Sequence, residues 1–357
     1  MSIDRNMKNE TFNKKSITIL PDFFLDVIIN PSYSFNEYLY QLKETYSRGG
    51  GNILGPSIKF KPGGNGGNVA LTTNALRIPT NFLGKTSQFG SKIIDYYFSK
   101  EGINCVFSEN GILASSFILE FKDEDNISNV MSSSSGSVAD FSYNQLTNSQ
   151  IEIIKSSTVI AITNFQNSFL LELSGMILDN LLDNTIFSID FSDLTPHKNR
   201  LDEIYNFFNR SGRKPDFIVG NENEISILAS KINLNNENNT IHPLNAQLLS
   251  EEFKDIYFCL HTAQYSCIYR NGKLLGSQNT FKLPKIENAT GAGDSWHGGF
   301  LYGILKNHHF KNRDFEFLPW DDILSFANLV AGFWVSQGKP GNQDEIYDFS
   351  KSISRNK

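Results

Sequence analysis

The chain has 357 residues, of which 39% are hydrophobic and 13% aromatic, so it can bury a sizeable core in one large α/β domain or in two smaller ones. Its net charge is -6, its isoelectric point is about 5.6, and its Lys and Arg residues are not clustered, which argues against a nucleic acid groove or an anionic membrane surface as the main partner. A small molecule is the expected ligand.

The amino-terminal segment, residues 1–16, is polar throughout and lacks the apolar stretch of a secretory signal. The longest apolar runs are too short to span a bilayer, and the cysteines Cys105, Cys259 and Cys267 lack the spacing of metal ligands. These features predict a cytoplasmic protein with reduced thiols.

From Ser16 onward, short runs typical of strands alternate with longer runs typical of helices. Strands are predicted at 16–20, 24–29, 157–163, 185–190, 216–220 and 255–261. Helices are predicted at 69–75, 168–182, 201–209 and 222–230. This alternation is typical of a mainly parallel sheet covered by helices.

Two segments, 30–61 and 112–137, interrupt the alternation and are expected to project from the core as lid elements. The α/β core would then comprise 16–29, 62–111 and 138–350. The aromatic residues at 35–46 could stack on a nucleobase, although the packing face of an ordinary helix explains them more simply. The polar run at 233–239 is predicted to be a solvated surface loop.

The first glycine cluster is "PGGNGGNVA" at 62–70. The G-x-G-x-x-G spacing of dinucleotide-binding loops would require a glycine where Val69 stands, so that function is excluded. A glycine loop that leads into a helix can instead bring a hydroxylated substrate close to backbone amides. Asn68 offers both a donor and an acceptor to such a substrate.

Asn221 and Glu224 follow a predicted strand and lie one helical turn apart in "GNENEISIL". An amide and a carboxylate in this arrangement could orient water molecules on Mg²⁺, which usually keeps several waters when it binds to proteins. Taken alone, the pair is more simply an N-cap Asn with a capping-box Glu.

The second glycine cluster is "NATGAGDSW" at 288–296. Residues 290–293 have little or no side chain, so their backbone N–H groups can face a ligand. Apolar residues recur at helical spacing after Asp294, which predicts a helix with Asp294 as its N-cap. Amides at the positive end of a helix dipole would bind a phosphate, but a tight turn with a capping Asp fits this stretch equally well.

Together these motifs resemble the signatures of the ribokinase-like carbohydrate kinases, the PfkB-type family. "NATGAGDSWHGGF" is similar to the family's D-T-x-G-A-G-D-x-F-x-G-G-F, "GGNGGNVA" to its G-G-x-x-x-N-x-A, and "NENE" to its N-x-x-E. The matches occur in family order from about Asp22 to Gly341. The resemblance implies a three-layer α/β/α sandwich of the ribokinase type, with a mainly parallel central sheet and a small β-rich lid.

The same resemblance implies roles for single residues. Asp294 would be the general base, and the amides of Gly291, Ala292 and Gly293 would form an anion hole for the transferring phosphoryl group. The acceptor hydroxyls would bind to four residues around the first glycine loop, namely Asp26, Gly63, Gly64 and Asn68.

For the nucleotide, the resemblance implies ATP with Mg²⁺. Asn221 and Glu224 would organise the metal through water, and Thr262 and Asn328 would lie beside the nucleotide.

Two motifs depart from the family pattern. Family members usually have T-L-G-x-x-G where this chain has "LHTAQY", so Thr262 and Tyr265 occupy glycine positions and the nucleotide pocket is expected to differ in shape. Asn288 replaces the first Asp of the C-terminal signature, which removes a charge from the region where many relatives bind a monovalent cation. We therefore expect only weak dependence on K⁺.

The predicted function is an ATP-dependent kinase that phosphorylates a hydroxyl of a small sugar or sugar acid. A nucleoside kinase is the alternative, because that branch shares the same motifs, and a non-catalytic binding protein with the kinase fold is the third reading. The expected partner is a small molecule and neither nucleic acid nor membrane, with a homodimer through the lid as a further expectation.

Overall fold

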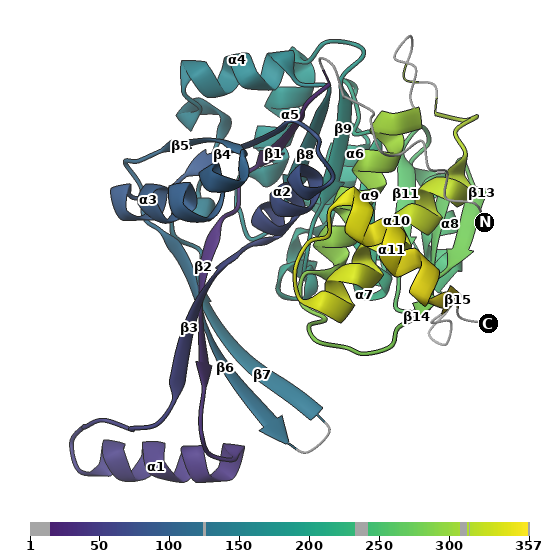
Figure 1. Cartoon of the computed structure of the whole chain (residues 1–357). Coiled ribbons are helices and arrows are strands. Elements are labelled where there is room, and N and C mark those ends of the chain that lie inside the picture. The colour runs from purple at the N-terminus through teal and green to yellow at the C-terminus, as the bar shows by residue number, and fades with distance from the viewer. Residues whose placement is uncertain (1–14, 124–125, 233–241, 308–312, 314, 356–357) are drawn as a thin grey trace.

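The computed structural model describes residues 15–123, 126–232, 242–307, 313 and 315–355. It contains a large central sheet of nine strands, a separate sheet of four strands, and helices on both faces of the central sheet (Figure 1). The surface loop predicted at 233–239 lies outside the described residues. None of the described helices combines the length and the apolar character that crossing a membrane requires.

The central sheet is parallel from β11 to β5, and β12 and β13 add an antiparallel edge. In sheet order its strands are β13 (Lys273–Asn279), β12 (Tyr265–Arg270), β11 (Tyr257–His261), β10 (Phe217–Asn221), β9 (Ile186–Asp190), β8 (Val159–Thr163), β1 (Ile17–Leu20), β4 (Thr80–Lys85) and β5 (Asn104–Ser108). Every residue of β1, β8 and β9 is buried, because helices cover both faces of a parallel sheet.

Side chains of the central strands alternate between two hydrophobic cores, as the period of a strand requires. In β8, Val159 and Ala161 belong to one core, and Ile160 and Ile162 to the other. The first core is covered by α2 (Asn65–Ala75), α3 (Gln88–Tyr97), α9 (Ala292–Asn307), α10 (Trp320–Gln337) and α11 (Gln343–Ser352). The second is covered by α4 (Asn148–Ser156), α5 (Leu170–Asn180), α6 (Leu201–Phe208), α7 (Glu222–Ala229) and α8 (His242–Glu252). The predicted three-layer sandwich is confirmed.

The lid sheet has the order β3 (Ser57–Gly63), β2 (Phe24–Asn30), β6 (Ala114–Asp123), β7 (Asn126–Ser134), and it extends away from the core (Figure 1). Its second strand, β2, belongs to this sheet, although residues 24–29 were expected in the core. The chain leaves the central sheet at the end of β1 and enters the lid within a few residues. The exact division of the chain into core and lid segments stays a prediction.

Helix α1 (Phe35–Ser47) lies at the far end of the lid (Figure 1). Its Phe35 and Tyr38 rings contact Phe121 edge-on, at centroid distances of 5.3 and 5.9 Å. Phe121 lies on the face of β6 opposite to Ser116, the partner of Asp26 in β2. The aromatic residues at 35–46 therefore include a packing face that lies against the outer side of the lid.

The outer face of the lid also exposes apolar side chains. More than half of the surface of Ile58, Phe60, Phe117 and Val130 is accessible to solvent. The strand register places these side chains on one face of the lid sheet. The homodimer through the lid stays a prediction.

Two smaller strands, β14 (Phe281–Lys282) and β15 (Ser354–Arg355), pair near the carboxyl end of the chain. Short 3₁₀ helices lie at Ser99–Glu101, Gly136–Val138, Tyr143–Gln145 and Thr195–Arg200.

Candidate active site

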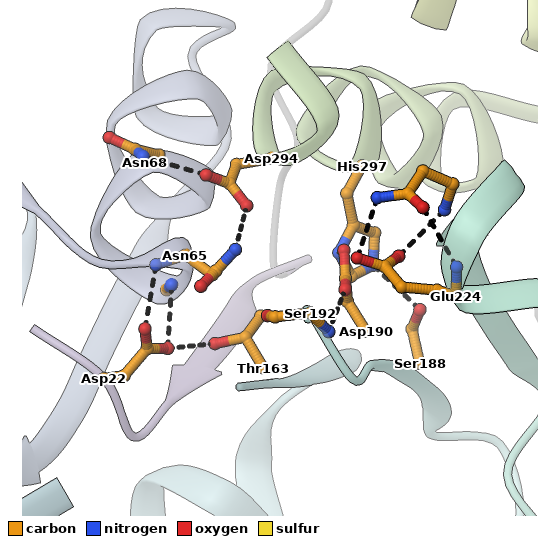
Figure 2. A network of polar contacts seen from close by, with 12 residues as sticks. Asp22, Asn65, Asn68, Thr163, Ser188, Asp190, Ser192, Glu224, Asp294 and His297 are labelled. Carbon is orange, nitrogen blue, oxygen red and sulfur yellow. Dashed lines mark hydrogen bonds and ion pairs between the residues drawn. The ribbon is translucent and has the colours of Figure 1, made fainter. Parts of the chain in front are cut away.

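Polar residues end several of the parallel strands of the central sheet at one edge, and the predicted Asn221 is one of them. Asp190 ends β9, Asn221 ends β10 and His261 ends β11. The first turns of α2 and α9 face the same edge (Figure 2). This edge is where open α/β sheets bind ligands, because the loops that follow the strands diverge there.

Asp294 lies at the centre of this cluster and is 6% exposed. Its Oδ1 accepts a hydrogen bond from Asn65 Nδ2 and its Oδ2 accepts one from Asn68 Nδ2, each at 2.8 Å (Figure 2). Asn68 was predicted to bind the acceptor, and here it contacts the predicted base. Asn65 was not predicted. It lies three residues before Asn68 and therefore on the same face of α2, which is the signal that could have identified it.

The environment of Asp294 raises its pKa to about 8. Burial is the main cause, the charge of Asp190 adds to it, and the amides of Asn68 and Asn65 act in the opposite direction. A carboxylate whose pKa lies near neutrality is suited to accept a proton during catalysis and to release it afterwards.

The predicted N-cap role of Asp294 is wrong. Helix α9 begins at Ala292, so Asp294 is the third residue of the helix. The small residues before it can adopt helical geometry and extend the helix backward. In the first turn, a carboxylate still benefits from the positive end of the helix dipole.

The loop before Asp294 requires glycine at position 291. Gly291 has a φ of +84°, and a Cβ there would lie 2.8 Å from Cζ2 of Trp334. Trp334 Nε1 donates to the carbonyl of Thr290 at 2.8 Å and supports the loop from behind. The N–H of Ala292 donates to the Ala289 carbonyl at 3.2 Å, whereas the N–H groups of Gly291 and Gly293 make no hydrogen bond within the described residues. Two of the three predicted amides are thus free for an anion.

The other glycine loop joins the lid to Asp294. A Cβ on Gly63 would lie 2.2 Å from Oδ2 of Asp26, and Gly64 has a φ of +87°. Only glycine permits this contact and this conformation. Helix α2 starts directly afterwards and carries the two amides that hold Asp294. The segment 63–68 thus connects the predicted acceptor residues to the predicted base.

Asp26 lies inside β2, which runs from Phe24 to Asn30. It pairs in register with Lys61 of β3 and with Ser116 of β6. Burial raises the pKa of Asp26 to about 6, although a hydrogen bond from Ser116 and the charge of Lys61 counteract this shift. Asp26 therefore faces a polar surface of the lid.

Asp22 is a further carboxylate near Asp294, and it was not predicted from the sequence. It is fully buried. Its oxygens accept hydrogen bonds from the backbone N–H groups of Asn65 at 2.8 Å and Gly66 at 2.9 Å, and from the hydroxyl of Thr163 (Figure 2). It therefore fixes the amino-terminal end of α2 against β8. No local pattern distinguishes Asp22, because its partners are distant in the sequence.

Asn221 and Glu224 form the capping box that was the simpler interpretation. The Glu224 carboxylate accepts hydrogen bonds from the backbone N–H and the side-chain amide of Asn221, each at 2.8 Å. Burial raises the pKa of Glu224, and the charges of Asp190 and Asp294 add to this effect. The capping box therefore belongs to the same electrostatic cluster as Asp294.

Thr262 and Asn328 are engaged elsewhere. The Thr262 hydroxyl accepts from the N–H of Tyr265 at 3.0 Å and closes the turn between β11 and β12. Asn328 is 3% exposed, accepts from Trp296 Nε1 at 2.8 Å and donates to the Gln278 carbonyl at 3.1 Å. Both side chains stabilise local packing, and within the described residues neither forms a hydrogen bond with Asp294, Asn221 or Glu224.

The cluster contains four buried carboxyl groups. Within the described residues, no Lys or Arg forms an ion pair with Asp22, Asp190, Glu224 or Asp294, and the pKa values of Asp190, Glu224 and Asp294 are raised by burial and by neighbouring carboxylates. Buried carboxylates of this kind fit a divalent cation. The described residues offer no group of three His, Cys, Asp or Glu that could bind a metal directly.

Comparison with protein families places residues 32–346 in the family described as pfkB family carbohydrate kinase. A protein of Clostridium botulinum named 5-dehydro-2-deoxygluconokinase is 27% identical over 316 residues, which cover 84% of this chain and 87% of the relative.

Among solved structures, adenosine kinase from Sinorhizobium meliloti is similar with a TM-score of 0.69 at 17% identity, over 95% of this chain and 99% of that one. Ribokinase from Arabidopsis thaliana, complexed with ribose and ATP, is similar with a TM-score of 0.69 at 14% identity, over 94% and 99% of the two chains. These similarities establish the ribokinase-like fold.

Proposed function

Because the chain belongs to the pfkB family of carbohydrate kinases, it is an ATP-dependent kinase of a sugar or sugar acid, and we propose that Asp294 is its general base. The observation that carries this assignment is the placement of one buried carboxylate, held at both oxygens, directly after two free amides at the start of α9. Transfer of a phosphoryl group needs this combination of a proton acceptor and an anion site.

In the proposed reaction, the acceptor hydroxyl gives its proton to Asp294 while its oxygen forms a bond to the γ-phosphorus. The bond from that phosphorus to the β-phosphate oxygen breaks, and the leaving charge remains on the diphosphate. The N–H groups of Gly291 and Gly293 stabilise the charge on the transferring group, and the Ala292 amide would join them if its bond to Ala289 opened. Asn65 and Asn68 hold the base in position.

Asn221 and Glu224 are proposed to hold Mg²⁺ through water, and bound Mg²⁺ would neutralise charge on the phosphates. Their support is the burial of the Glu224 carboxyl group near Asp190 and Asp294, whose charges add to the rise of its pKa. Thr262 and Asn328 are proposed to line the nucleotide pocket through the turn after β11 and through α10.

The acceptor is proposed to be a sugar acid that binds between Asp26 and the loop of Gly63 and Gly64. Two observations support an anionic acceptor. The relative from Clostridium botulinum is named for a gluconate derivative. Lys61 lies next to Asp26 in register and lowers its pKa, so a cation is present beside the proposed hydroxyl-binding carboxylate. Lys residues also protect edge strands such as β3 from pairing, which is the competing explanation for Lys61.

A panel of acceptors tests the proposed class. Release of ADP should be fastest with hexonates and keto-hexonates, slower with neutral sugars, and absent with nucleosides. Lys61→Gln should raise the KM for the acid about tenfold, which is the value of one hydrogen bond to a charged group, and should leave the KM for neutral sugars unchanged.

Lys59→Gln is the matched control, because Lys59 lies on the same lid face but two residues farther from Gly63. Equal effects of the two substitutions would assign both lysines to general edge protection. Turnover of nucleosides alone would replace the sugar acid with the nucleoside alternative.

Potassium should stimulate the enzyme less than twofold, whereas removal of Mg²⁺ should abolish turnover. Asn288 carries no formal charge, and its Oδ1 already accepts the N–H of Thr290 at 3.1 Å. The measurement compares K⁺ with tetramethylammonium at constant ionic strength. Strong activation by K⁺ would show that a cation site forms without the carboxylate that relatives have at this position.

A further inference from the structure

His297 and Asp190 form a buried pair that the proposed reaction has not used. His297 follows Asp294 by three residues on α9, is fully buried, and contacts β9 through a bond of 2.8 Å between its Nε2 and the Ser188 hydroxyl (Figure 2). Its Nδ1 has no hydrogen-bond partner in the described part of the chain. That nitrogen lies 3.9 Å from Oδ2 of Asp190.

The imidazole is neutral, because burial lowers the pKa of His297 to about 3. A neutral ring carries one hydrogen. If the Ser188 hydroxyl donates to Nε2, the hydrogen is on Nδ1 and faces the Asp190 carboxylate. When the Asp190 carboxyl group is ionised, the other tautomer would direct a lone pair at a negatively charged oxygen, which is unfavourable.

Ser188, His297 and Asp190 do not form a catalytic triad with a serine nucleophile, because the serine is buried. Ser188 is fully buried in β9, so its hydroxyl has no access to a substrate. Instead, Ser188 of β9 forms a hydrogen bond with His297, and His297 faces the carboxylate of Asp190 at the end of the same strand.

The other oxygen of Asp190 is fixed by the backbone. Its Oδ1 accepts the N–H of Ser192 at 2.8 Å, and Ser192 has a φ of +59°, which directs that N–H back toward the strand end. Asp190 is 4% exposed, and its Oδ2 has no hydrogen bond in the described residues although His297 faces it. Oδ1 of Asp190 is therefore held in place, and Oδ2 is available to accept a hydrogen bond from a ligand or from its bound water.

The ligand expected at this place is cationic. Figure 2 shows Asp190 beside Glu224, and Asp190 ends β9, the neighbour in the central sheet of β10, whose last residue is Asn221. The carboxyl group of Asp190 therefore lies next to the pair for which Mg²⁺ is proposed. A magnesium ion that enters with the nucleotide would be attracted by both carboxyl groups.

We propose that Asp190 is a further residue of the magnesium–nucleotide site, which it contacts through water, and that His297 is the positioning residue that holds its carboxylate toward the metal. This inference rests on the proposed kinase function. It adds a third residue, and a second carboxylate, to a site for which the sequence predicted only Asn221 and Glu224.

The test compares ADP binding with and without metal by calorimetry. For Asp190→Asn, the Kd of ADP in saturating Mg²⁺ should rise at least tenfold, because residues that orient bound metal typically contribute 10- to 100-fold to metal affinity. The Kd in EDTA should stay the same or fall, since a negative charge near the phosphates has been removed. Asp183→Asn is the control, because Asp183 is exposed and precedes β9, at the opposite end of that strand from Asp190.

His297→Phe should also weaken ADP binding in Mg²⁺ relative to ADP binding in EDTA, by a smaller factor than Asp190→Asn. It should raise the Mg²⁺ concentration at half-maximal rate and leave the KM of the acceptor unchanged. His297→Asn keeps a donor and should recover part of the loss, and it also replaces the Phe variant if that variant does not fold. Equal weakening of ADP binding with and without Mg²⁺, or no change in either variant, would overturn the inference. Wild-type protein that does not bind ADP with Mg²⁺ would overturn the proposed function itself.

Discussion

Replacement of Asp294 by Asn is expected to lower kcat by about 10² to 10⁴, the usual effect of losing a general base. The substitution preserves the size of the side chain but removes the proton acceptor. The affinity for ADP should change by less than about threefold, because Asp294 accepts hydrogen bonds from Asn65 and Asn68 and, within the described residues, forms none with the predicted nucleotide residues Thr262 and Asn328. Single-turnover kinetics and calorimetry measure the two quantities separately.

The pH profile provides a second readout for the same residue. The pKa of Asp294 is raised to about 8 in the free enzyme, so the carboxyl group is mostly protonated at pH 7 and cannot accept a proton. The value of kcat/KM should therefore increase with pH up to about 8 and then level off. This limb should disappear in Asp294→Asn. A variant that keeps half of the wild-type kcat, or a wild-type profile that is flat between about pH 6 and 9, would contradict the assignment.

Replacement of Asp26 by Ala is expected to raise the KM of the acceptor by one to two orders of magnitude. A carboxylate can accept two hydrogen bonds from a vicinal diol, and a bond to a charged group contributes about 1.5 to 3 kcal/mol. The KM of ATP should change little, since Asp26 lies in the lid sheet beside Gly63. Initial rates at varied acceptor and at varied ATP measure both constants.

Glu120→Ala is the matched control for Asp26, because Glu120 is a carboxylate of the same lid face that bonds to Asn30 at the far end of β2. It should leave both KM values unchanged. If Asp26→Ala lowered the melting temperature but kept its affinity for the acceptor, Asp26 would only stabilise the sheet. The acceptor pocket would then lie elsewhere on the lid.

The glycine loops could be predicted from the sequence because each is a local feature. A loop that precedes a helix needs small residues within a few positions, and both 62–70 and 288–296 display that pattern without reference to distant residues. Periodicity likewise predicted most of the buried strands and the helices between them, since both depend on neighbours along the chain. The capping box of Asn221 and Glu224 is a signal of the same kind.

The contacts that organise the site could not be predicted in this way. The bonds from Asn65 and Asn68 to Asp294 join residues more than 220 positions apart, and they exist because α2 packs against α9. Asp22 and the pair of His297 and Asp190 likewise depend on which strands and helices become neighbours. Even the start of α9 at Ala292 was decided by the structure, because the residue types before Asp294 are compatible with either a turn or a helix.

The sequence by itself determined the order of the elements, the apolar character of the central strands and the two glycine loops, because these follow from the chemistry of residues close together in the chain. Only the tertiary structure decided that β2 leaves the core for the lid, and that a buried cluster of carboxylates forms around Asp294. The physical reason is that burial and charge repulsion are properties of a packed environment. The raised pKa of Asp294 therefore arises only when strands and helices from the whole chain meet at one edge of the sheet.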